Sequence, residues 1–379
     1  MANYRTGFVF DERFLGHDAG IEATVTMRDG SFTLSPEPHP SALYITRRIK
    51  EFLDGAGLTT RMQPVAARAA TEDELAVYHT REYIAGVRAL ANGGPHKGDW
   101  GEVEFDTPLS TGSFEAALYA AGGAINAVNA VMCGDVRNTY ALLRPPGHHA
   151  MSNRAMGFCI FNNAVIAAQY AGRVYGLERI MIVDWDVHHG NGTQDAFYRD
   201  PSVLFVSLHQ HNWYPGLSGE LEQVGSGAGT GYTVNIPLPA GTGDRGYRAA
   251  FEQLVIPIAL HYKPQLLIIS AGQDASWLDP LAQNMMSMDG FRQISTYMHD
   301  IAEDICGGKL VLLQEGGYSA AYVPYCTAAV LEPVLGVDLG IVDLYAGSSE
   351  LECCQTIFTQ ETRDALMAAR MWHQNWWKL

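Results

Sequence analysis

Five short apolar runs alternate with helical patterns along this chain, and this alternation constrains the fold more than any other feature. The runs have the length and β-branched content of buried strands; they are Thr139–Leu143, Ile180–Val183, Val203–Leu208, Gln265–Ser270 and Lys309–Leu313. Helical patterns lie between most of them, at Asn162–Tyr175, Gly246–His261 and Asp289–Ile305. Strands and helices in such alternation form a parallel sheet with helices on both faces. We therefore predict a three-layer α/β/α fold with a central, mostly parallel sheet.

The rest of the chain is expected to belong to the same domain. No Pro/Ser-rich linker, low-complexity run or internal repeat divides the 379 residues, so we predict a single domain spanning 1–379. Upstream of the first run we expect a short strand at Gly7–Phe10, a covering loop at Ile21–Pro40 and a helix at Ser41–Ala56. A second helix is expected to start at Thr71, which forms a capping box with Glu74. A long loop at Ala91–Thr111 and an Ala/Gly-rich helix at Phe114–Met132 follow.

Polar residues follow each of the five apolar runs. In an open parallel sheet the carboxyl ends of the strands share one edge, where ligands bind. The second run leads into Asp184-Trp185-Asp186-Val187-His188-His189. Side chains on a strand alternate between its faces, so we expect Asp184, Asp186 and His188 to point the same way. A salt-bridged strand end is disfavoured, because Arg179 is the one cationic side chain in this stretch besides histidine. We therefore expect the five strand ends to build one polar site.

Three of these residues have the pattern of a catalytic metal site. Asp186 and His188 can bind one ion, and Asp274 can supply a third ligand from another strand end. Three protein ligands with an open position are typical of catalytic rather than structural sites. This ligand set suits Zn²⁺ best, with Fe²⁺, Mn²⁺ and Co²⁺ as alternatives. Such a metal lowers the pKa of bound water to roughly 7 and polarises a carbonyl.

A hydrolase also needs groups that move protons, and the other strand ends supply candidates. The adjacent imidazoles of His148 and His149 can divide the acid and base roles if their second nitrogens meet different partners. Asp184 is expected to orient one of them and Asn191 the other, without the pKa increase that an aspartate would cause. Tyr318, after Gly316-Gly317, can donate a hydrogen bond to an oxyanion. Taken alone, a histidine pair in the core and a tyrosine in a surface turn are ordinary features.

Composition narrows the partners. The net charge of −16 argues against nucleic-acid binding as a main role and weakly favours cationic substrates. No apolar segment reaches the length of a membrane span, and the first residues carry no secretory signal pattern. The six cysteines lack CxxC spacing, so we interpret them as reduced thiols of a cytoplasmic protein.

The motifs together resemble the histone deacetylase superfamily. They are PGHHA at Pro146–Ala150, AMGFCIFNN at Ala155–Asn163, DWDVHHGNGTQ at Asp184–Gln194, SLH at Ser207–His209, GQDA at Gly272–Ala275 with Asp279-Pro280-Leu281 beyond, and EGGY at Glu315–Tyr318. The resemblance covers nearly all of the chain. Asn191 and the chain length make the class II branch, and within it the bacterial histone deacetylase-like amidohydrolases, the most similar group.

The resemblance implies an arginase/deacetylase fold and roles for the catalytic residues. Zinc would be bound by Asp186, His188 and Asp274. His149 would act as general base and acid, with His148, backed by Asp184, as its electrostatic partner. Tyr318 would be the oxyanion donor. The expected reaction is hydrolysis of the amide of acyl-lysine or similar N-acyl amines.

The resemblance also implies binding residues around this centre. A narrow tunnel for the acyl-lysine-like chain would be lined by Gly157, Phe158, Tyr214 and Leu281, and Asp106 at its rim would steady the substrate backbone. Structural potassium would occupy two sites, one formed by Asp184, Asp186, His188, Ser207 and Leu208 and one by Phe197, Asp200, Val203 and Tyr232. Relatives of this type are often oligomers, so a homodimer or homotetramer is expected.

Two residues depart from the family pattern. Gln273 stands where relatives usually carry Phe, and Tyr214 replaces another Phe in the tunnel wall. The amide of Gln273 is expected to bond a neighbour and to alter the metal environment or the substrate preference, and the hydroxyl of Tyr214 to favour a more polar substrate. Neither change removes a catalytic group, so we expect an active enzyme.

Several alternatives stay open. An acetylpolyamine amidohydrolase would use the same chemistry on a small cationic substrate. An arginase-like ureohydrolase would need a second metal, for which the segment Gly272–Pro280 offers a partial ligand set. A zinc-bearing binding protein without activity is the non-enzymatic reading. The C-terminal MWHQNWWKL either docks another subunit or closes the chain's own core.

Overall fold

A parallel sheet forms the centre of the molecule. The computed structural model describes residues 6–27, 30–94, 97–98, 101–216, 218–345 and 347–379. Within them the main sheet has eight strands in the order β11-β10-β9-β12-β13-β7-β1-β4, and every pair of neighbours is parallel. The bounds are β1 Thr6–Val9, β4 Gln63–Pro64, β7 Asn138–Ala141, β9 Ile180–Asp184, β10 Val203–Gln210, β11 Thr233–Leu238, β12 Leu266–Ala271 and β13 Leu310–Gln314. The predicted parallel sheet is confirmed.

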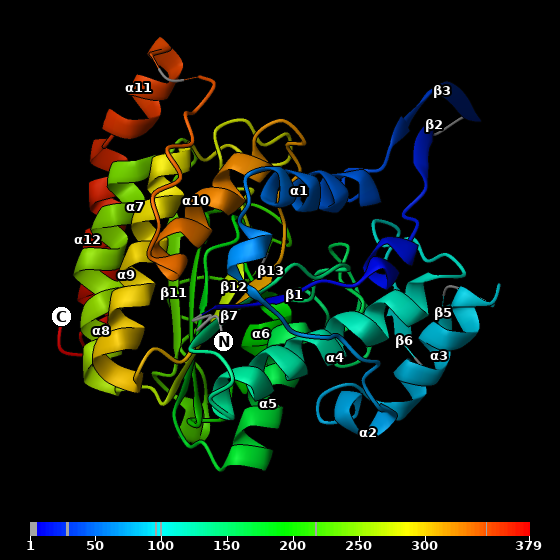
Figure 1. Cartoon of the computed structure of the whole chain (residues 1–379), viewed down its shortest axis with the longest axis horizontal. Helices are drawn as coiled ribbons and strands as arrows, with labels where there is room; N and C mark the ends of the chain where they lie inside the picture. Colours follow the sequence, from blue (N-terminus) through cyan, green and yellow to red (C-terminus); the bar gives the residue numbers. More distant parts are fainter. Residues whose placement is uncertain (1–5, 28–29, 95–96, 99–100, 217, 346) are drawn as a thin grey trace.

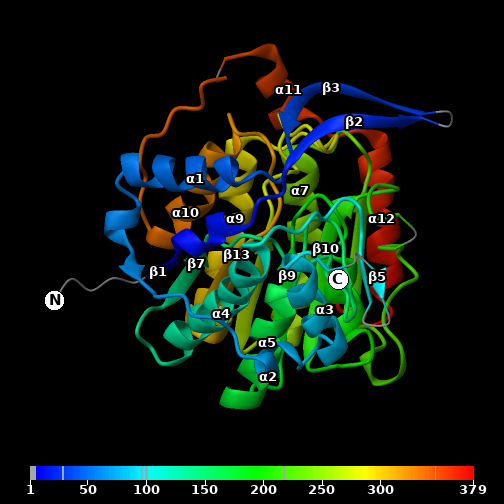
Figure 2. The same cartoon turned by 90° about the vertical axis from the view of Figure 1, so that its right-hand side faces the viewer.

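Helices cover both faces of this sheet (Figures 1 and 2). One layer contains α4 (Ser113–Met132), α5 (Asn163–Tyr175) and α6 (Asn191–Phe197). The other contains α7 (Asp244–Ala250), α8 (Ile256–Tyr262), α9 (Met288–Cys306) and α10 (Val323–Leu335), with the π-helical turn η4 (Phe251–Val255) between α7 and α8. Further helices are α1 (Leu43–Gly55), which packs on α10, and α2 (Glu72–Leu75), α3 (Arg81–Ala91), α11 (Ser349–Thr356) and α12 (Gln360–His373). Short 3₁₀ turns are η1 (Glu12–Gly16), η2 (Thr59–Arg61) and η3 (Gly227–Gly229).

Alternating side chains of the strands supply the two halves of the core. In β9, Met181 and Val183 belong to the cluster under α9 and α10, whereas Ile180 and Ile182 belong to the cluster under α4 and α5. All four are essentially inaccessible to solvent. A strand buried on both faces reads as a continuous apolar run rather than an alternating one. This is why Ile180–Val183 was recognisable from the sequence.

The chain end packs against the sheet edge. The ring of Trp377 is buried, and its Nε1 donates to the Gly231 carbonyl (3.0 Å). His373 in α12 pairs through Nε2 with the Asn235 carbonyl of β11 at 2.9 Å. Helix α12 therefore covers the edge strand of the sheet, which protects it from pairing with other chains. Trp377 therefore closes part of the chain's own core, while docking of another subunit at this end stays a prediction.

The prediction of a covering loop at Ile21–Pro40 is wrong. Strands β2 (Ile21–Met27) and β3 (Gly30–Pro38) form an antiparallel hairpin there, and Figures 1 and 2 show it projecting away from the body. The segment contains β-branched residues on both sides of Asp29-Gly30, a dipeptide typical of hairpins. That signal was available in the sequence and outweighs the abundance of turn-forming residues.

Other predictions hold with changes in detail. The capping box of Thr71 and Glu74 is present, but α2 ends at Leu75 and a separate helix, α3, begins at Arg81. The predicted loop Ala91–Thr111 contains the short strands β5 (Lys97–Gly98) and β6 (Gly101–Val103), and β6 pairs with β8 (Arg154–Ala155). Strand β11 was not predicted, because Pro237 weakens its pattern; proline is tolerated there since the strand lies at the sheet edge. None of the described helices is long and apolar enough to cross a membrane.

Candidate active site

The segment after β9 carries the first part of the site. Strand pairing stops at Asp184, so the expectation that strand alternation alone places Asp186 and His188 is wrong. Instead, carboxylates bind the free backbone N–H groups beyond the strand end: Asp184 Oδ1 accepts from the N–H of Asp186 (3.1 Å) and Asp186 Oδ1 from that of His188 (2.9 Å). The rings of Trp185 and the side chain of Val187 stay in the core. The apolar side chains thus hold one side of this segment while its polar side chains face the site.

Three ligand atoms converge as predicted. The Nδ1 atom of His188 lies 3.1 Å from Asp186 Oδ1 and 3.0 Å from Asp274 Oδ2, and all three side chains are buried. The remaining carboxylate oxygens are held by the backbone, since Val187 N donates to Asp274 Oδ1 (2.8 Å) and Gly316 N to Asp186 Oδ2 (2.8 Å). The trio therefore has a fixed orientation toward a common point.

The chemistry of this trio fits a cation. Burial, followed by the nearby Asp186 carboxylate, raises the pKa of Asp274 well above its ordinary value. None of the ion pairs among the described residues brings a Lys or Arg to either carboxylate. Two buried carboxylates without such a partner are costly unless a metal binds them. The donor set of two carboxylates and one imidazole is one that divalent transition metals accept.

Two glycines bring the backbone close to this trio. A Cβ atom at Gly316 would lie 2.3 Å from Asp274 Oδ2, and one at Gly272 would lie 2.3 Å from Asp186 Oδ2. Real Cβ atoms do not approach oxygen so closely, so any side chain at either position would displace a carboxylate. Glycine is required here for the close approach rather than for turn conformation.

His148 is paired with a carboxylate, as predicted. Its Nδ1 lies 3.0 Å from Asp184 Oδ2. Burial alone would lower the pKa of His148, but the carboxylates of Asp186 and Asp184 outweigh it and raise this pKa well above the ordinary value. The backbone N–H groups of Gly147 and His148 donate to Glu315 Oε2 at 2.6 and 3.1 Å. Glu315 is part of the motif EGGY, but its role in holding this loop is not apparent from the sequence.

His149 has a different second partner, also as predicted. Its Nδ1 lies 2.8 Å from Asn191 Oδ1, and its ring centroid lies 3.9 Å from that of His148. Burial, together with the neighbouring His148 and His188, lowers the pKa of His149 well below the ordinary value. The two adjacent imidazoles are therefore pushed in opposite directions, which is the separation that a pair with different proton-transfer roles requires.

Tyr318 reaches the same place from the loop after β13. A Cβ placed on Gly316 would lie 2.9 Å from the Tyr318 hydroxyl as well as beside the carboxylates, so this phenol lies next to the trio. Burial and then the Asp186 and Asp274 carboxylates raise the pKa of Tyr318, which keeps the hydroxyl protonated and able to donate. The Tyr318 N–H donates to Asp279 Oδ2 (2.8 Å). Asp279, quoted only as part of a motif, thus holds this loop in place.

A cavity of about 560 Å³ leads from the surface to the trio. Its walls include all five residues predicted to bind substrate, and also His149, His188 and Tyr318; the five are Asp106, Gly157, Phe158, Tyr214 and Leu281. Sequence reasoning missed Asn212, Trp213, Pro215 and Gly216, which lie next to Tyr214 in the same wall. The indole Nε1 of Trp213 donates to the Leu281 carbonyl (2.8 Å), so the two walls are linked.

Asp106 contacts the loop that forms the tunnel. Its two carboxylate oxygens each lie 3.3 Å from the N–H of Gly157, and Thr107 Oγ1 accepts from the N–H of Phe158 (2.9 Å). Phe158 has a φ of 65°, which is unusual for a bulky residue and is tolerated where surrounding contacts hold it. Asp106 is therefore in place at the rim but already has a partner within the protein.

The two residues that depart from the family pattern lie in different surroundings. Gln273 is fully buried and does not face the tunnel; its Nε2 donates to the Ala271 carbonyl (2.8 Å), and its Oε1 accepts from Gln314 Nε2 (2.7 Å). Its expected bond to a neighbour is confirmed. Tyr214 does face the tunnel, with its ring centroid 5.0 Å from that of His149. Burial and then the neighbouring Asp106 and Glu104 carboxylates raise the pKa of its hydroxyl.

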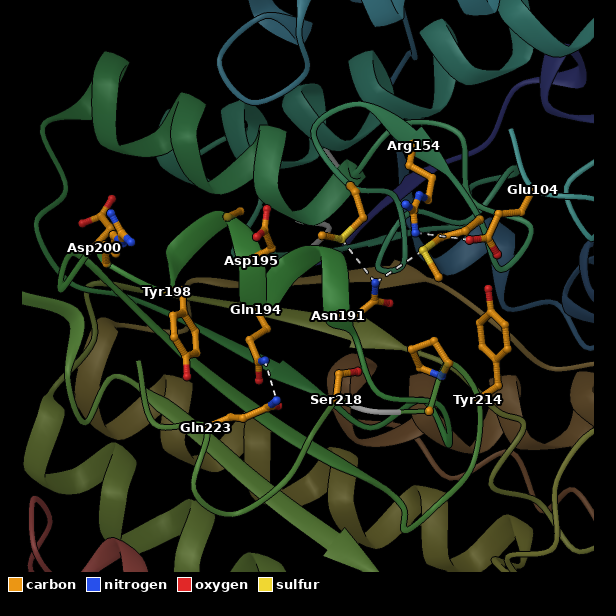
Figure 3. Close-up of a pocket in the computed structure, with 16 residues that line it drawn as sticks. Glu104, Arg154, Asn191, Gln194, Asp195, Tyr198, Asp200, Tyr214, Ser218 and Gln223 are labelled. Carbon is orange, nitrogen blue, oxygen red and sulfur yellow. Dashed lines mark hydrogen bonds and ion pairs between the residues drawn. The ribbon is translucent and has the colours of Figure 1, made fainter. Parts of the chain in front are cut away.

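A second cavity, of about 950 Å³, adjoins the tunnel and shares Tyr214, Pro215 and Gly216 with its wall; Figure 3 shows the residues that line it. Many of its lining residues come from α6 and the segment after it, including the polar Asn191, Asp195, Tyr198 and Asp200. Asn191 thus has His149 on one side and this cavity on the other.

The residues predicted to bind potassium are neighbours in pairs. Asp184 and Ser207 are register partners in β9 and β10, with Leu208 next in β10. Around the start of β10, Asp200 N donates to the Phe197 carbonyl (3.1 Å) and Phe205 N to the Tyr232 carbonyl (2.9 Å), and Val203 is the first residue of the strand. Potassium at either place stays a prediction.

Comparison with known proteins places the chain in a family. The sequence model of the histone deacetylase domain matches residues 39–334. The histone deacetylase-like amidohydrolase of Pseudomonas aeruginosa is 40% identical over 96% of this chain and 94% of that protein, and a probable deacetylase of Archaeoglobus fulgidus is 37% identical over 89% and 88%. The crystal structure of the HDA15 HD domain matches with a TM-score of 0.83 at 35% identity, over 99% of this chain and 96% of that one. The chain therefore belongs to the histone deacetylase family of amide-hydrolysing enzymes.

Proposed function

We propose that the chain is a zinc-dependent deacetylase that hydrolyses the amide of acyl-lysine or similar N-acyl amines. The observation that carries this proposal is that the ligand trio, His149 and Tyr318 meet at the inner end of one tunnel. Asp186, His188 and Asp274 would bind the zinc ion, which would supply a Lewis acid for the amide carbonyl and lower the pKa of a water molecule. Every other group that hydrolysis needs comes from the protein.

His149 is the proposed proton carrier. With Nδ1 engaged by Asn191, its Nε2 is the nitrogen left to act on substrate. It takes the proton from the attacking water and returns it to the departing amine, so that the amine leaves as a neutral group. The low pKa of His149 suits the first step, because the imidazole starts neutral. His148, held by Asp184, contributes positive charge next to it.

Tyr318 is the proposed oxyanion donor. Its hydroxyl remains protonated beside the trio and can donate to the carbonyl oxygen as negative charge develops there. Its position is preset by the bond from its own N–H to Asp279, so little reorganisation is needed during the reaction. Donors of this type contribute roughly 3 kcal/mol to transition-state stabilisation.

The tunnel favours an extended amine with a polar or cationic outer part. Phe158 and Tyr214 line its walls, and Asp106 lies at its rim next to Glu104, which faces the neighbouring cavity. Together with the net charge of −16, these carboxylates favour cationic substrates. An acetylpolyamine has the same chemistry in a smaller molecule and is the second candidate substrate class.

The structure gives less support to an arginase-like ureohydrolase, which would need a second metal ion. Among the described residues a second group of candidate ligands is formed by His148, Cys159 and Glu315. Glu315 is occupied by two backbone N–H groups, and burial raises the pKa of the Cys159 thiol, which keeps it protonated. This group is a poor second metal site for a dimanganese ureohydrolase. A binding protein without activity would have no use for the paired imidazoles and Tyr318.

We also propose structural potassium at the two predicted places, a homodimer or homotetramer, a cytoplasmic location, and no nucleic-acid or membrane partner. The potassium proposal rests on the adjacency of the residues around β10 and on the family resemblance. Light scattering after size exclusion of the full chain tests the oligomer. Potassium titration of the thermal midpoint, with sodium as control, tests the ion.

The central experiment is an activity panel with metal analysis of the same sample. Acyl-lysine peptides, acetylated polyamines and small amides are compared by kcat/KM. We expect about one zinc per chain and a clear preference for acyl-lysine or acetylpolyamine. Two metals per chain with release of urea from a guanidinium substrate would support the ureohydrolase, and no turnover of any amide by the zinc-loaded protein would refute the proposal.

A further inference from the structure

The amide of Asn191 contacts two thioethers as well as His149. Its Oδ1 lies 2.8 Å from His149 Nδ1, and its Nδ2 lies 3.2 Å from Met151 Sδ and 3.5 Å from Met156 Sδ. Figure 3 shows both sulfur contacts as dashed lines that meet at the nitrogen of Asn191. The amide therefore has one side toward the imidazole and the other toward two sulfurs.

An amide differs from a carboxylate in that its two ends are not equivalent. Rotation by 180° exchanges a donor for an acceptor at almost no steric cost, so the neighbours decide the orientation. A thioether sulfur accepts hydrogen bonds weakly and cannot donate. With Oδ1 turned toward Met151 and Met156, acceptors would face each other. Both sulfurs therefore favour the orientation in which Nδ2 points to them and Oδ1 to the imidazole.

This orientation selects one tautomer of His149. Because Oδ1 can only accept, Nδ1 of the neutral imidazole must carry the hydrogen, and Nε2 is left with a free lone pair. His148 needs no such help, since either oxygen of Asp184 accepts equally well. The partner of His148 can therefore accept from Nδ1 in either orientation, whereas the partner of His149 can do so in only one. The two imidazoles also differ in charge.

The sulfurs are held by a structured loop. Met151 N donates to the Arg154 carbonyl (2.9 Å), and Met156 and Cys159 bond each other through both backbone groups, at 3.2 and 2.9 Å. Met156 is 6% exposed, so its sulfur has little freedom to leave the amide. The next residues of the same loop, Gly157 and Phe158, form the tunnel wall.

We propose that Met151 and Met156 are positioning residues that fix the amide of Asn191 and, through it, the reactive tautomer of His149. The inference rests on the proposed role of His149 as the proton carrier. Neither methionine touches substrate; both act through Asn191.

A double-mutant cycle separates this role from packing. Met151→Leu and Met156→Leu, combined, keep the volume of the side chains and remove both acceptors. In the natural background we expect kcat for an acetyl-lysine peptide to fall about five- to tenfold, with KM within about twofold. In an Asn191→Asp background the same pair of changes should alter kcat less than about twofold, because a carboxylate has no orientation to lose. Equal losses in both backgrounds would show a packing effect and overturn the proposal, as would no loss in the natural background.

A second readout does not depend on activity. Nitrogen NMR of protein with labelled histidine, with the His149 signals assigned by comparison with His149→Ala, reports which ring nitrogen carries the hydrogen. We expect the Nδ1–H form in the unmodified chain and a mixture of tautomers in the double leucine variant. Met298→Leu, a buried methionine in α9 on the opposite face of the sheet, is the matched control and should change neither readout. An unchanged His149 spectrum in the double variant overturns the proposal, whereas an inactive unmodified chain would count against the deacetylase function and leave this test intact.

Discussion

The floor and the rim of the tunnel are built in different ways. At the floor, Asp186 and Asp274 are fully buried, and backbone N–H groups hold their oxygens from several sides. At the rim, Asp106 holds the tunnel loop through Gly157, and its neighbour Phe105 is entirely exposed. The backbone thus fixes the positions of the floor carboxylates, while the shape of the rim depends on individual side chains such as Asp106. We therefore expect the floor to set which reaction occurs and the rim to set which molecules reach it.

The largest effect is expected from removing a floor ligand. Asp274→Ala leaves two ligands and an unpaired backbone N–H at Val187, so the bound zinc should fall well below one per chain and turnover should be lost. Metal analysis and kcat on the same sample measure both. Glu222→Ala, at an exposed carboxylate, should retain both metal and activity. Full metal content in the Asp274 variant would contradict the assignment of this ligand.

Removing the proposed proton carrier, His149, should separate chemistry from metal binding. His149→Ala leaves the ligand trio untouched, so we expect zinc to remain near one per chain while kcat falls about 10²- to 10⁴-fold. An acetyl-lysine fluorogenic substrate gives the rate, and metal analysis the zinc content. Activity within tenfold of the unmodified chain would remove His149 from the mechanism.

The next effect compares two tyrosines, one on the floor and one on the wall. Tyr318→Phe deletes the proposed oxyanion donor and should lower kcat about 10²-fold with KM nearly unchanged. Tyr214→Phe deletes a hydroxyl that lies near the Asp106 and Glu104 carboxylates, away from the reacting groups, and should change kcat less than about threefold. Steady-state kinetics of both variants on one substrate measure the two changes in kcat. Similar decreases in kcat for the two variants would mean that the wall and the floor do not have distinct roles.

The smallest effect belongs to the rim. Asp106→Ala should raise KM for a peptide substrate about tenfold and leave kcat within a few-fold, because the chemistry lies deeper. Asp106→Asn keeps an acceptor for the Gly157 N–H and should recover part of the loss if the role is to hold the loop. Phe105→Ala is the control and should have no measurable effect. A fall in kcat larger than that of the Tyr318 variant would reverse the comparison.

The same contrast separates what the sequence could and could not predict. The convergence of the trio, the partners of both imidazoles and the place of all five tunnel residues could be predicted, because each lies at a strand end or in a motif with few possible functions. Glu315 and Asp279 were missed as supports, because their work is done on backbone N–H groups that leave no trace in a residue pattern.

Where the sequence misled, local patterns competed with tertiary context. Turn-forming residues concealed the hairpin β2–β3, and Pro237 concealed β11, whose edge position makes a proline acceptable. Asp186 and His188 do face the site together, but strand alternation is not the reason. Their placement depends on carboxylate bonds to backbone N–H groups after the strand has ended.

The two glycines that approach the carboxylates limit how this protein can vary. Gly272 and Gly316 contribute no functional group, yet even a methyl group at either position would meet a carboxylate oxygen at 2.3 Å. In a library of random variants, these positions should therefore be as intolerant as the ligands themselves. Variants with altered selectivity should instead accumulate around Asp106 and Tyr214, so evolution in the laboratory would find new substrates for this enzyme long before it found a new reaction.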